Sequence, residues 1–424
     1  MGPSIIFDKS ALQSLKDDEA MWLDNFYQAN ITPLFFVETL ADLEKEVRAG
    51  KTPEEVVGII AYKTPENSCS NVHHMDLLYV ELMGYETVEM SGRPIVCDGK
   101  FVKLGDETGI IYLESKETEA FRRWQRHEFL EIERVIAKKW RAELQGTAPD
   151  IIKQKFEPFL HALGIPKSFE ELKKMVDNML NQGKTQGDIL LLGLKTIGVS
   201  PEAVGLVVKR WEDSGKPQLK EFMPFFMHVF SVNLFFYLGT ASNLFSRFPH
   251  AQTHFVDIAY LYYLPFCDIF VSSDKLHITI APLFFRPDQT FINGNSLKTD
   301  LENLDLHFSA LPDEVKDRGT FTFAQIPPDD STFFTTRMWD KYMSSKWRGM
   351  QSRKFDGSDQ IDSETDRKLV EKIERFTKNA VPAALSADED DIQQMIVKRM
   401  ISARKGKWKR FPPEVESSKK RIME

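Results

Sequence analysis

The chain has 424 residues, of which 42% are hydrophobic and 28% charged, and its formal net charge at pH 7 is −8. This composition is typical of globular proteins, and the length allows two or three domains. The net negative charge argues against a surface coated in nucleic acid, although it is compatible with local basic patches. The three cysteines include no CxxC pair, which argues against a disulfide framework or a structural zinc site. Because the N-terminus shows no signal peptide and cysteines are few, we expect a cytoplasmic protein.

The first fifty residues predict a short strand followed by helices. Residues 4–8 form an apolar run that ends in Asp8, which is typical of a buried strand. Apolar residues then recur at helical spacing from Ser10 to Ala29. Pro33 opens a second helical segment, which Gly50 closes.

The middle of the chain predicts a β-hairpin and then helices. Residues 93–104 and 109–115 look like paired strands around a turn. Residues 117–144 have the pattern of one long helix, and the helical pieces that follow are broken at 164–166 and 198–201.

Residues 222–238 are nearly all apolar and invite a membrane interpretation. The run is shorter than the roughly 20 residues of a spanning helix and contains a proline and several polar side chains. The pattern favours a buried core helix, so we expect no contact with a membrane.

A strand that ends in an acid occurs again in the last third of the chain. The segment after residue 254 predicts a helix that begins near Asp257, a break at Pro265 and a strand that ends near Asp274. A short strand and a helix are expected within 287–304. The remainder is polar and predicted to be helical, with a linker or mobile loop at 355–367.

Four carboxylates stand out in these elements. Asp8 and Asp274 follow strands, and side chains at the carboxyl ends of adjacent parallel strands converge on one crevice. Asp257 and Glu38, in neighbouring helices, can reach the same space. If the four acids do converge, they repel one another unless a cation neutralises them, and hard oxygen ligands select Mg²⁺ or Mn²⁺. Such a site can activate a water for attack on a phosphodiester.

The same residues resemble the motifs of PIN domains. These domains open with a hydrophobic strand into D-x-S/T, as IIFDKSAL does with Asp8 and Ser10. They continue with a glutamate in an apolar helix, as TPLFFVETLADL does with Glu38. They close with two spaced aspartates, as VDIAYLYYLPFCDIFVSSDKLH does with Asp257 and Asp274. A long insertion between the second and third motifs departs from the compact pattern.

The resemblance implies an α/β fold with a PIN-like three-layer core formed by residues 1–48 and 225–310 around a mostly parallel sheet. Residues 49–224 would be an inserted, mainly helical region with a β-hairpin, and residues 311–424 a helical, partly basic C-terminal extension. It also implies a Mg²⁺- or Mn²⁺-dependent nuclease, most often an endoribonuclease, with RNA as substrate and single-stranded DNA as the second choice. Domains of this family often pair, so a homo-oligomer is compatible with it.

In that interpretation Asp8, Glu38, Asp257 and Asp274 are both metal ligands and catalytic residues, while Ser10 and Asp268 support them. Each has a plainer alternative. The aspartates and Ser10 can be helix caps, and Glu38 can belong to a solvated face.

The roles of two histidines near these aspartates remain open, and so do two alternative functions. His254 and His277 are either donors to a substrate oxygen or structural histidines. A catalytically silent PIN-like module that binds RNA or a protein is one rival. A phosphatase of the haloacid-dehalogenase type is another, but that family needs D-x-D and DKS lacks the second acid.

Two basic segments are candidates for nucleic-acid contact. Residues 337–354 interleave aromatic with basic side chains, which suits phosphate contact and base stacking. The residues selected there are Arg337, Lys341, Lys346, Trp347 and Arg348. The second segment, 398–410, is preceded by an acidic run that can neutralise it, and both segments can be ordinary solvated faces.

Overall fold

The computed structural model describes most of the chain up to residue 352 and a short C-terminal stretch. The described residues are 2–45, 50–96, 99–105, 107–112, 115–143, 149–182, 185–248, 254–352 and 401–411, with a few isolated residues between 353 and 400. The predicted loop at 355–367, the acidic run at 387–391 and the side chain of His254 lie outside the described residues.

The fold is α/β and is organised around a five-stranded sheet in which every neighbouring pair is parallel. The spatial order is β3-β2-β1-β6-β7. The strands are β1 Ser4–Phe7, β2 Gln28–Ile31, β3 Ser68–Ser70, β6 Ile269–Ser272 and β7 Thr290–Asn293. In the centre, Ile5 of β1 pairs with Ala29 of β2 on one side and with Ile269 of β6 on the other.

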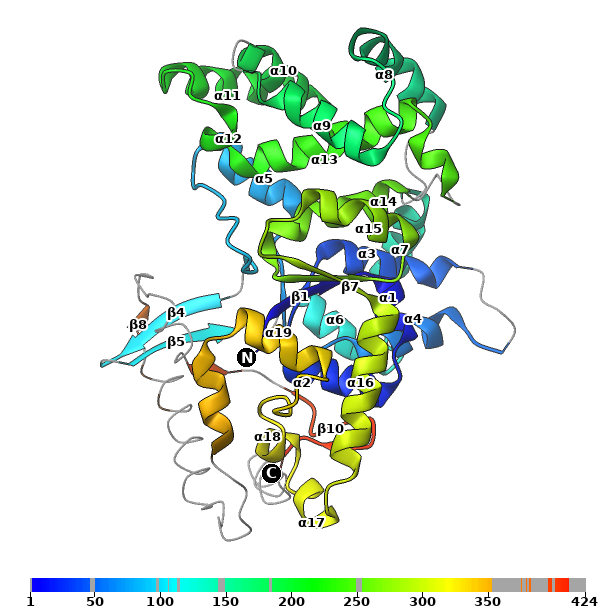
Figure 1. Ribbon diagram of the computed structural model, residues 1–424, viewed down its shortest axis with the longest axis vertical. Coiled ribbons are helices and arrows are strands. Elements are labelled where there is room, and N and C mark those ends of the chain that lie inside the picture. The colour runs from blue at the N-terminus through cyan, green and yellow to red at the C-terminus, as the bar shows by residue number, and fades with distance from the viewer. Residues whose placement is uncertain are drawn as a thin grey trace.

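Helices cover both faces of this sheet, so the core has three layers (Figure 1). Successive strand residues point to opposite faces. Ile5 and Phe7 therefore join one apolar cluster, and Ile6 joins the other. The Ile5 face is covered by α1 Lys9–Ser14, α2 Asp17–Phe26, α3 Pro33–Ala41, α4 Pro53–Lys63, α6 Lys116–Gln125, α7 Glu131–Glu143, α16 Gly294–Ser309 and α19 Phe334–Tyr342.

The Ile6 face is covered by a second set of helices, which includes the apolar run singled out in the sequence. This set comprises α5 His74–Met83, α13 Pro224–Ala241, α14 His254–Ala259, the 3₁₀ helix η4 Tyr260–Phe266 and α15 Lys275–Ile280. Further helices of the insertion pack beyond them, at the top of Figure 1: α8 Pro149–Leu163, α9 Phe169–Leu180, α10 Gln186–Ile197, α11 Pro201–Asp213 and α12 Leu219–Phe222.

By length and composition alone, α13 is the one helix within the described residues that is long and apolar enough to cross a membrane. Most of it is nevertheless buried among α5, α8, α9 and α10. Glu81 of α5 caps its first turn by accepting hydrogen bonds from the backbone N–H groups of Phe225 and Phe226. The arrangement agrees with the predicted core helix.

Two strands were missed in the sequence. The predicted helical segment ran to Ala29 and overlaps residues 28–31, and residues 68–70 were placed in the insertion, but both ranges are strands of the central sheet. The predicted boundary after residue 48 is therefore misplaced, because α4 and β3 belong to the sheet and its covering layer. The predicted helix at 117–144 is also two helices, α6 and α7, which are separated at His127, a residue with positive φ.

Other predicted elements are confirmed. The hairpin consists of β4 Gly99–Leu104 and β5 Glu107–Tyr112, which pair antiparallel. The helix breaks at 164–166 and 198–201 are present. The described C-terminal stretch is not helical, since it forms a small antiparallel hairpin of β10 Arg404–Lys405 and β11 Trp408–Lys409.

Candidate functional site

The site suggested by the sequence lies where the sheet changes direction. The chain moves from β1 outward to β3 on one side and returns to β6 on the other side of β1. In open α/β sheets, ligands bind outside the carboxyl ends of the strands at such a switch point. Asp8 directly follows β1, and Asp274 lies two residues after β6. The structure therefore brings both aspartates to one edge of the sheet.

Asp8 is fixed first by its own local structure. It is the N-cap of α1, and its Oδ1 accepts a hydrogen bond of 2.8 Å from the backbone N–H of Ala11. The Ser10 hydroxyl donates to the same carboxylate at 2.8 Å. The helix-cap alternative is thus correct for Asp8, and it coexists with a position at the switch point.

Two further side chains hold Asp8 from the neighbouring strand and helix. The hydroxyl of Ser272, the last residue of β6, donates to Asp8 Oδ2 at 2.6 Å, and the His277 Nδ1 lies 3.5 Å from the same oxygen. Burial raises the pKa of Asp8, but its contacts with His277, Ser272 and Ala11 outweigh burial and lower the pKa below the ordinary value. Asp8 is therefore ionised although it is only 5% exposed.

The hydrogen bonds of His277 indicate its protonation state. Its Nε2 faces the backbone carbonyl of Asp257 at 2.7 Å, and a carbonyl can only accept, so Nε2 carries a proton. Its Nδ1 lies 2.9 Å from the Ser272 oxygen, whose hydrogen goes to Asp8 and which also accepts from the N–H of Asp274. Nδ1 must then donate as well. The ring is an imidazolium: burial lowers its pKa, but Asp8 and Asp257 outweigh this and raise it to about 9.

Glu38 enters the site from α3. Its Oε2 accepts a hydrogen bond of 2.5 Å from the hydroxyl of the buried Tyr260. The ammonium group of Lys9 lies beside it, bonded to the Glu38 backbone carbonyl at 3.2 Å and to the Asp42 carboxylate at 3.1 Å. Burial raises the pKa of Glu38, Lys9 and Tyr260 partly offset this, and the negative charge of Asp8 adds to the rise. The solvated-face alternative for Glu38 is therefore wrong.

Asp257 shows that the acids influence one another. It lies within α14, whose first residue is His254, so it is not the N-cap of its helix. Burial raises its pKa to about 7; the positive charge of His277 opposes the rise, and the negative charges of Glu38, Asp274 and Asp8 add to it. Asp257 therefore lies within electrostatic reach of Glu38, Asp274 and Asp8.

Asp274 is held more loosely than Asp8. It is the N-cap of α15, where its Oδ1 accepts a hydrogen bond of 2.6 Å from the backbone N–H of Leu276. Its own N–H donates to Ser272 Oγ at 2.9 Å. No side chain of another segment donates to its carboxylate among the described contacts, and the group remains partly exposed. We call Asp8, Glu38, Asp257 and Asp274 together the carboxylate crevice.

The donor chemistry of the carboxylate crevice fits a hard divalent cation, since all four groups offer carboxylate oxygens. Within the described residues, however, no three Asp, Glu, His or Cys side chains surround one point closely enough to hold a metal ion. Mg²⁺ often takes only one or two protein carboxylates and keeps several waters. The crevice therefore offers ligands for a partly hydrated ion and not a preformed protein cage.

Asp268, predicted to support the crevice, is in the wrong place for that role. It precedes β6, and its carboxylate accepts hydrogen bonds from the backbone N–H and the hydroxyl of Ser4, at 2.9 and 2.8 Å. Ser4 begins β1. Asp268 thus ties together the amino ends of the two central strands, at the edge opposite to Asp8, because a residue before a parallel strand and one after it lie a full strand length apart.

The predicted stacking residue in the basic segment 337–354 is unsuited to bases. Trp347 is only 4% exposed and packs edge-on against the indole of Trp339, with ring centroids 5.6 Å apart. Trp339 in turn donates through its indole N–H to the backbone of Phe26 at 2.9 Å. Both indoles belong to the apolar cluster on the Ile5 face of the sheet.

Basic side chains selected in this segment also have partners within the protein. Arg348 pairs with Asp340 at 2.6 Å and also contacts Asp329. Arg337 donates to backbone carbonyls of the preceding loop, and Lys341 donates to Thr290 at 2.7 Å. Lys346 is exposed. The basic and aromatic alternation that suggested RNA contact is explained by local packing and pairing.

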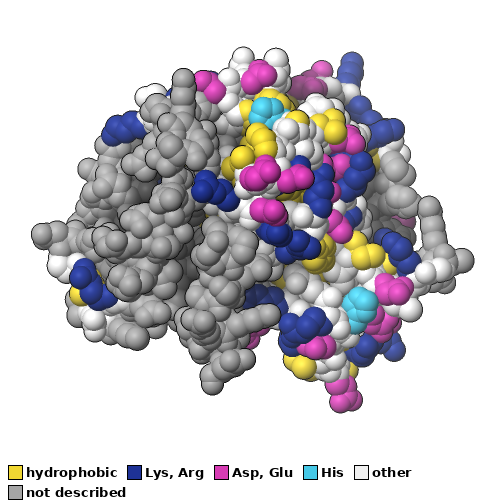
Figure 2. Space-filling model, turned by 90° about the horizontal axis from the view of Figure 1, so that it is seen from below, with side chains coloured by type: hydrophobic (Ala, Val, Ile, Leu, Met, Phe, Trp, Pro, Cys, Tyr) yellow, Lys and Arg dark blue, Asp and Glu magenta, His cyan; other side chains and the backbone are white. Residues whose placement is uncertain are grey.

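The second basic segment, 398–410, is likewise used in folding within its described part. Lys405 and Arg410 are 1% exposed and bind the buried carboxylate of Asp24. On the face shown in Figure 2, basic and acidic side chains of the described residues are interspersed, and no patch of basic side chains alone is seen among them.

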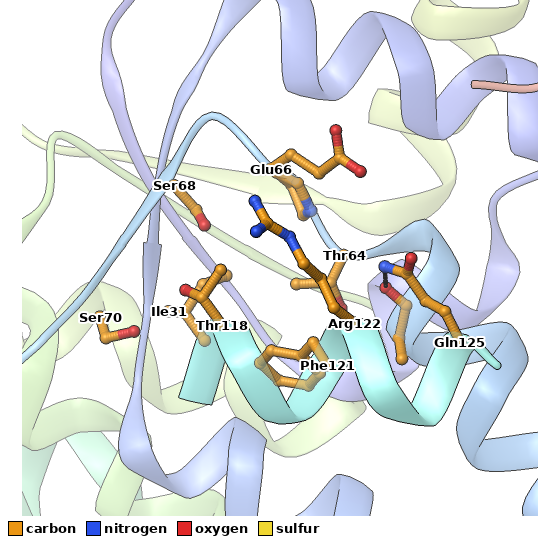
Figure 3. A pocket seen from close by; sticks show the side chains of 11 residues that line it. Ile31, Thr64, Glu66, Ser68, Ser70, Thr118, Phe121, Arg122 and Gln125 are labelled. Atoms are coloured by element: carbon orange, nitrogen blue, oxygen red, sulfur yellow. Dashed lines mark hydrogen bonds between the residues drawn. The ribbon is translucent and has the colours of Figure 1, made fainter. Parts of the chain in front are cut away.

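A surface pocket lies at the β3 edge of the sheet, between α4 and α6 (Figure 3). Ser68, Ser70 and Thr118 line it beside Arg122 and Glu66. None of the four crevice carboxylates contributes to its lining. The pocket is therefore separate from the site suggested by the sequence.

The residues that hold the crevice acids carry only weak signals in the sequence. The sequence predicts no role for Ser272, Tyr260 or Lys9, and it leaves His277 as either a donor to substrate or a structural residue. Ser272 and Lys9 flank motif aspartates, which is a usable signal. Tyr260 lies three residues after Asp257, so helical spacing gives a weak one.

Compared with known proteins, the chain matches no family model, no curated protein and no solved structure.

Proposed function

We propose that the chain is a Mg²⁺- or Mn²⁺-dependent nuclease of the PIN-like type and that it cleaves RNA endonucleolytically. The observation that carries the proposal is the placement of two acids at the switch point: Asp8 and Asp274 follow the neighbouring strands β1 and β6, and the Ser272 hydroxyl donates to the Asp8 carboxylate and accepts from the backbone N–H of Asp274. Burial, together with the negative charges of Glu38, Asp274 and Asp8, raises the pKa of Asp257 to about 7, which agrees with an excess of acidic groups there. A crevice with this excess of negative charge at a switch point attracts a cation. The parallel sheet order and the motif resemblance support the same class.

The protein groups have distinct parts in this proposal. Asp274 and Asp257, which keep carboxylate oxygens open to further ligands, together with Glu38 and Asp8 would hold the ion. When bound, a divalent cation supplies an activated water and stabilises the charge that develops on the phosphate. Tyr260 fixes the Glu38 carboxylate and Ser272 fixes that of Asp8, so both acids are oriented before the substrate arrives.

A second function, a catalytically silent PIN-like module that binds RNA or a protein, is favoured by one observation. Asp8, Glu38 and Asp274 each already accept a short hydrogen bond from the protein, and no three groups form a metal cage within the described residues. Such a site can be a relic in which protein donors replaced the ion.

Cleavage of labelled RNA and single-stranded DNA with Mn²⁺, Mg²⁺ or EDTA separates the two functions. Asp274→Asn tests the site, and Asp313→Asn, the same change at a helix start remote from it, is the matched control. The nuclease proposal expects cutting that requires metal, is lost in D274N and persists in D313N. If the wild type cuts neither substrate, the silent module is the better proposal.

A further inference from the structure

His277 joins the segments that carry two of the crevice acids. It lies in α15, three residues after Asp274, and is fully buried. One ring nitrogen reaches Asp8 through Ser272, and the other bonds the backbone carbonyl of Asp257. Because both nitrogens are engaged and the ring has no access to solvent, His277 cannot donate to a substrate oxygen.

The two contacts act on different carboxylates. Through the Ser272 hydroxyl, which is also fully buried, His277 determines where Asp8 Oδ2 points. Through the carbonyl of Asp257, it fixes α14 and therefore the base of the Asp257 side chain. His277 thus bridges the segment after β1, which carries Asp8, and the helix α14, which carries Asp257.

We infer that His277 is a positioning residue, which orients Asp8 through Ser272 and anchors Asp257 through its backbone so that both carboxylates face one crevice. The inference rests on the proposed metal-dependent function, because orientation matters only if the acids share a ligand. Partners of this kind, which contact ligands and not the metal, typically change metal affinity or activity by about 10- to 100-fold when they are removed.

The test measures Mn²⁺ binding by calorimetry in the full-length protein, with metal-free circular dichroism to confirm folding. Ser272→Ala removes the link to Asp8. His277→Gln removes the ring contact with Ser272, while its amide can still donate to the Asp257 carbonyl. His277→Phe removes both contacts. The matched control is His228→Gln, since His228 bonds a backbone carbonyl at 2.8 Å, that of Leu261, outside the crevice.

We expect S272A and H277Q each to weaken Mn²⁺ binding about 10- to 100-fold. H277F should bind Mn²⁺ more weakly than either, and H228Q should bind it as tightly as the wild type. Because the two residues act on Asp8 as one unit, the double variant S272A/H277Q should bind about as weakly as the weaker single variant. Loss of packing alone would not leave H277Q with a higher affinity for Mn²⁺ than H277F.

The failures are distinguishable. A wild type that binds Mn²⁺, with S272A and H277Q binding equally well, overturns the positioning role and leaves the nuclease proposal intact. Effects of the two substitutions that multiply also overturn it, because they show independent action. A wild type that binds no Mn²⁺ overturns both.

Discussion

Two clusters of charged side chains within the described part of the chain are built on opposite principles. The first is the carboxylate crevice. The second, which we call the C-terminal clamp, consists of Asp24 and Glu66 with Lys405 and Arg410, and it attaches the described C-terminal hairpin to α2 and to the loop before β3.

In the C-terminal clamp the charges balance. Arg410 lies 2.5 Å from Asp24 and 3.3 Å from Glu66, and Lys405 lies 3.6 Å from Asp24. Burial raises the pKa of Asp24, but Arg410 and Lys405 outweigh it and lower the pKa below the ordinary value. All the charges are neutralised by the fold itself, so the cluster needs no outside ion.

In the carboxylate crevice acids outnumber basic side chains: His277 contacts Asp8, and Lys9 bonds the backbone of Glu38 and the carboxylate of Asp42. Burial and the neighbouring acids raise the pKa values of Glu38 and Asp257, the latter to about 7, against the opposing charges of Lys9 and His277. The comparison teaches that burial alone does not mark a functional site. In the function that we propose, the unbalanced cluster is the one that would hold a cation.

The largest effect is expected in the clamp. Asp24→Asn keeps the shape of the side chain but leaves Lys405 and Arg410 buried with too little negative charge. Breaking a buried ion pair costs about 3–5 kcal/mol. Urea unfolding should show a loss of that size. A change below about 1 kcal/mol would mean that the clamp does not contribute to the stability of the fold.

A divalent cation should stabilise the crevice and not the clamp. At Mn²⁺ concentrations about 100 times the dissociation constant, linkage predicts a gain of about 2.7 kcal/mol in the free energy of unfolding. Thermal unfolding should show the gain, EDTA should reverse it, and Asp274→Asn should abolish it. An equal gain in D274N would place the ion elsewhere.

Replacing Asp257 should have a smaller effect on the free energy of unfolding than replacing Asp24 of the clamp, and it should stabilise the protein where the Asp24 change destabilises it. The pKa of Asp257 rises from 3.8 in the unfolded chain to about 7 in the fold. Its contribution to stability is therefore fully present below the unfolded pKa and is lost as pH rises through the folded value. At pH 8 without metal, Asp257→Asn should be more stable than the wild type by about 2 kcal/mol, after allowance for partial exposure.

The difference between D257N and the wild type should shrink as the pH falls and vanish only below the unfolded pKa of 3.8, where the wild-type carboxyl is protonated in both the folded and the unfolded chain. Thermal unfolding at several pH values measures it. A constant difference across this range would show that Asp257 does not titrate with a raised pKa.

The smallest effect is expected at Arg348, which belongs to neither cluster. Its ion pairs with Asp340 and Asp329 are exposed, so Arg348→Ala should cost less than about 1 kcal/mol. Together with Lys346→Ala, it should also leave the salt dependence of RNA binding unchanged. A markedly shallower salt dependence would restore this segment as a contact for RNA.

The sequence predicted the α/β class and the placement of Asp8 and Asp274 at one edge of the sheet from particular features. Apolar runs that end in Asp8 and near Asp274 mark strands, and parallel strands place their carboxyl ends together. The helix breaks at 164–166 and 198–201 were also legible, because glycine and proline act locally. Each of these features has a physical cause that lies within a few residues of it in the sequence.

The strands β2 and β3 could not be predicted from the sequence, because their formation depends on contacts with distant segments. They are only four and three residues long and carry polar side chains such as Asn30, which is buried because it donates to the backbone carbonyl of Phe266 at 3.0 Å. From the sequence alone, such a polar residue predicts a loop or a helix end, because its hydrogen-bond partner lies in a distant segment.

The sequence by itself determined the parallel core and the set of acids, since hydrophobic period and residue type are local properties. The tertiary structure decided which charges are neutralised. Only the fold brings Arg410 to Asp24 and His277 to Asp8, and only the fold buries Trp347. The energy of a charge depends on what lies within a few ångströms of it, and that neighbourhood is assembled from residues hundreds of positions apart.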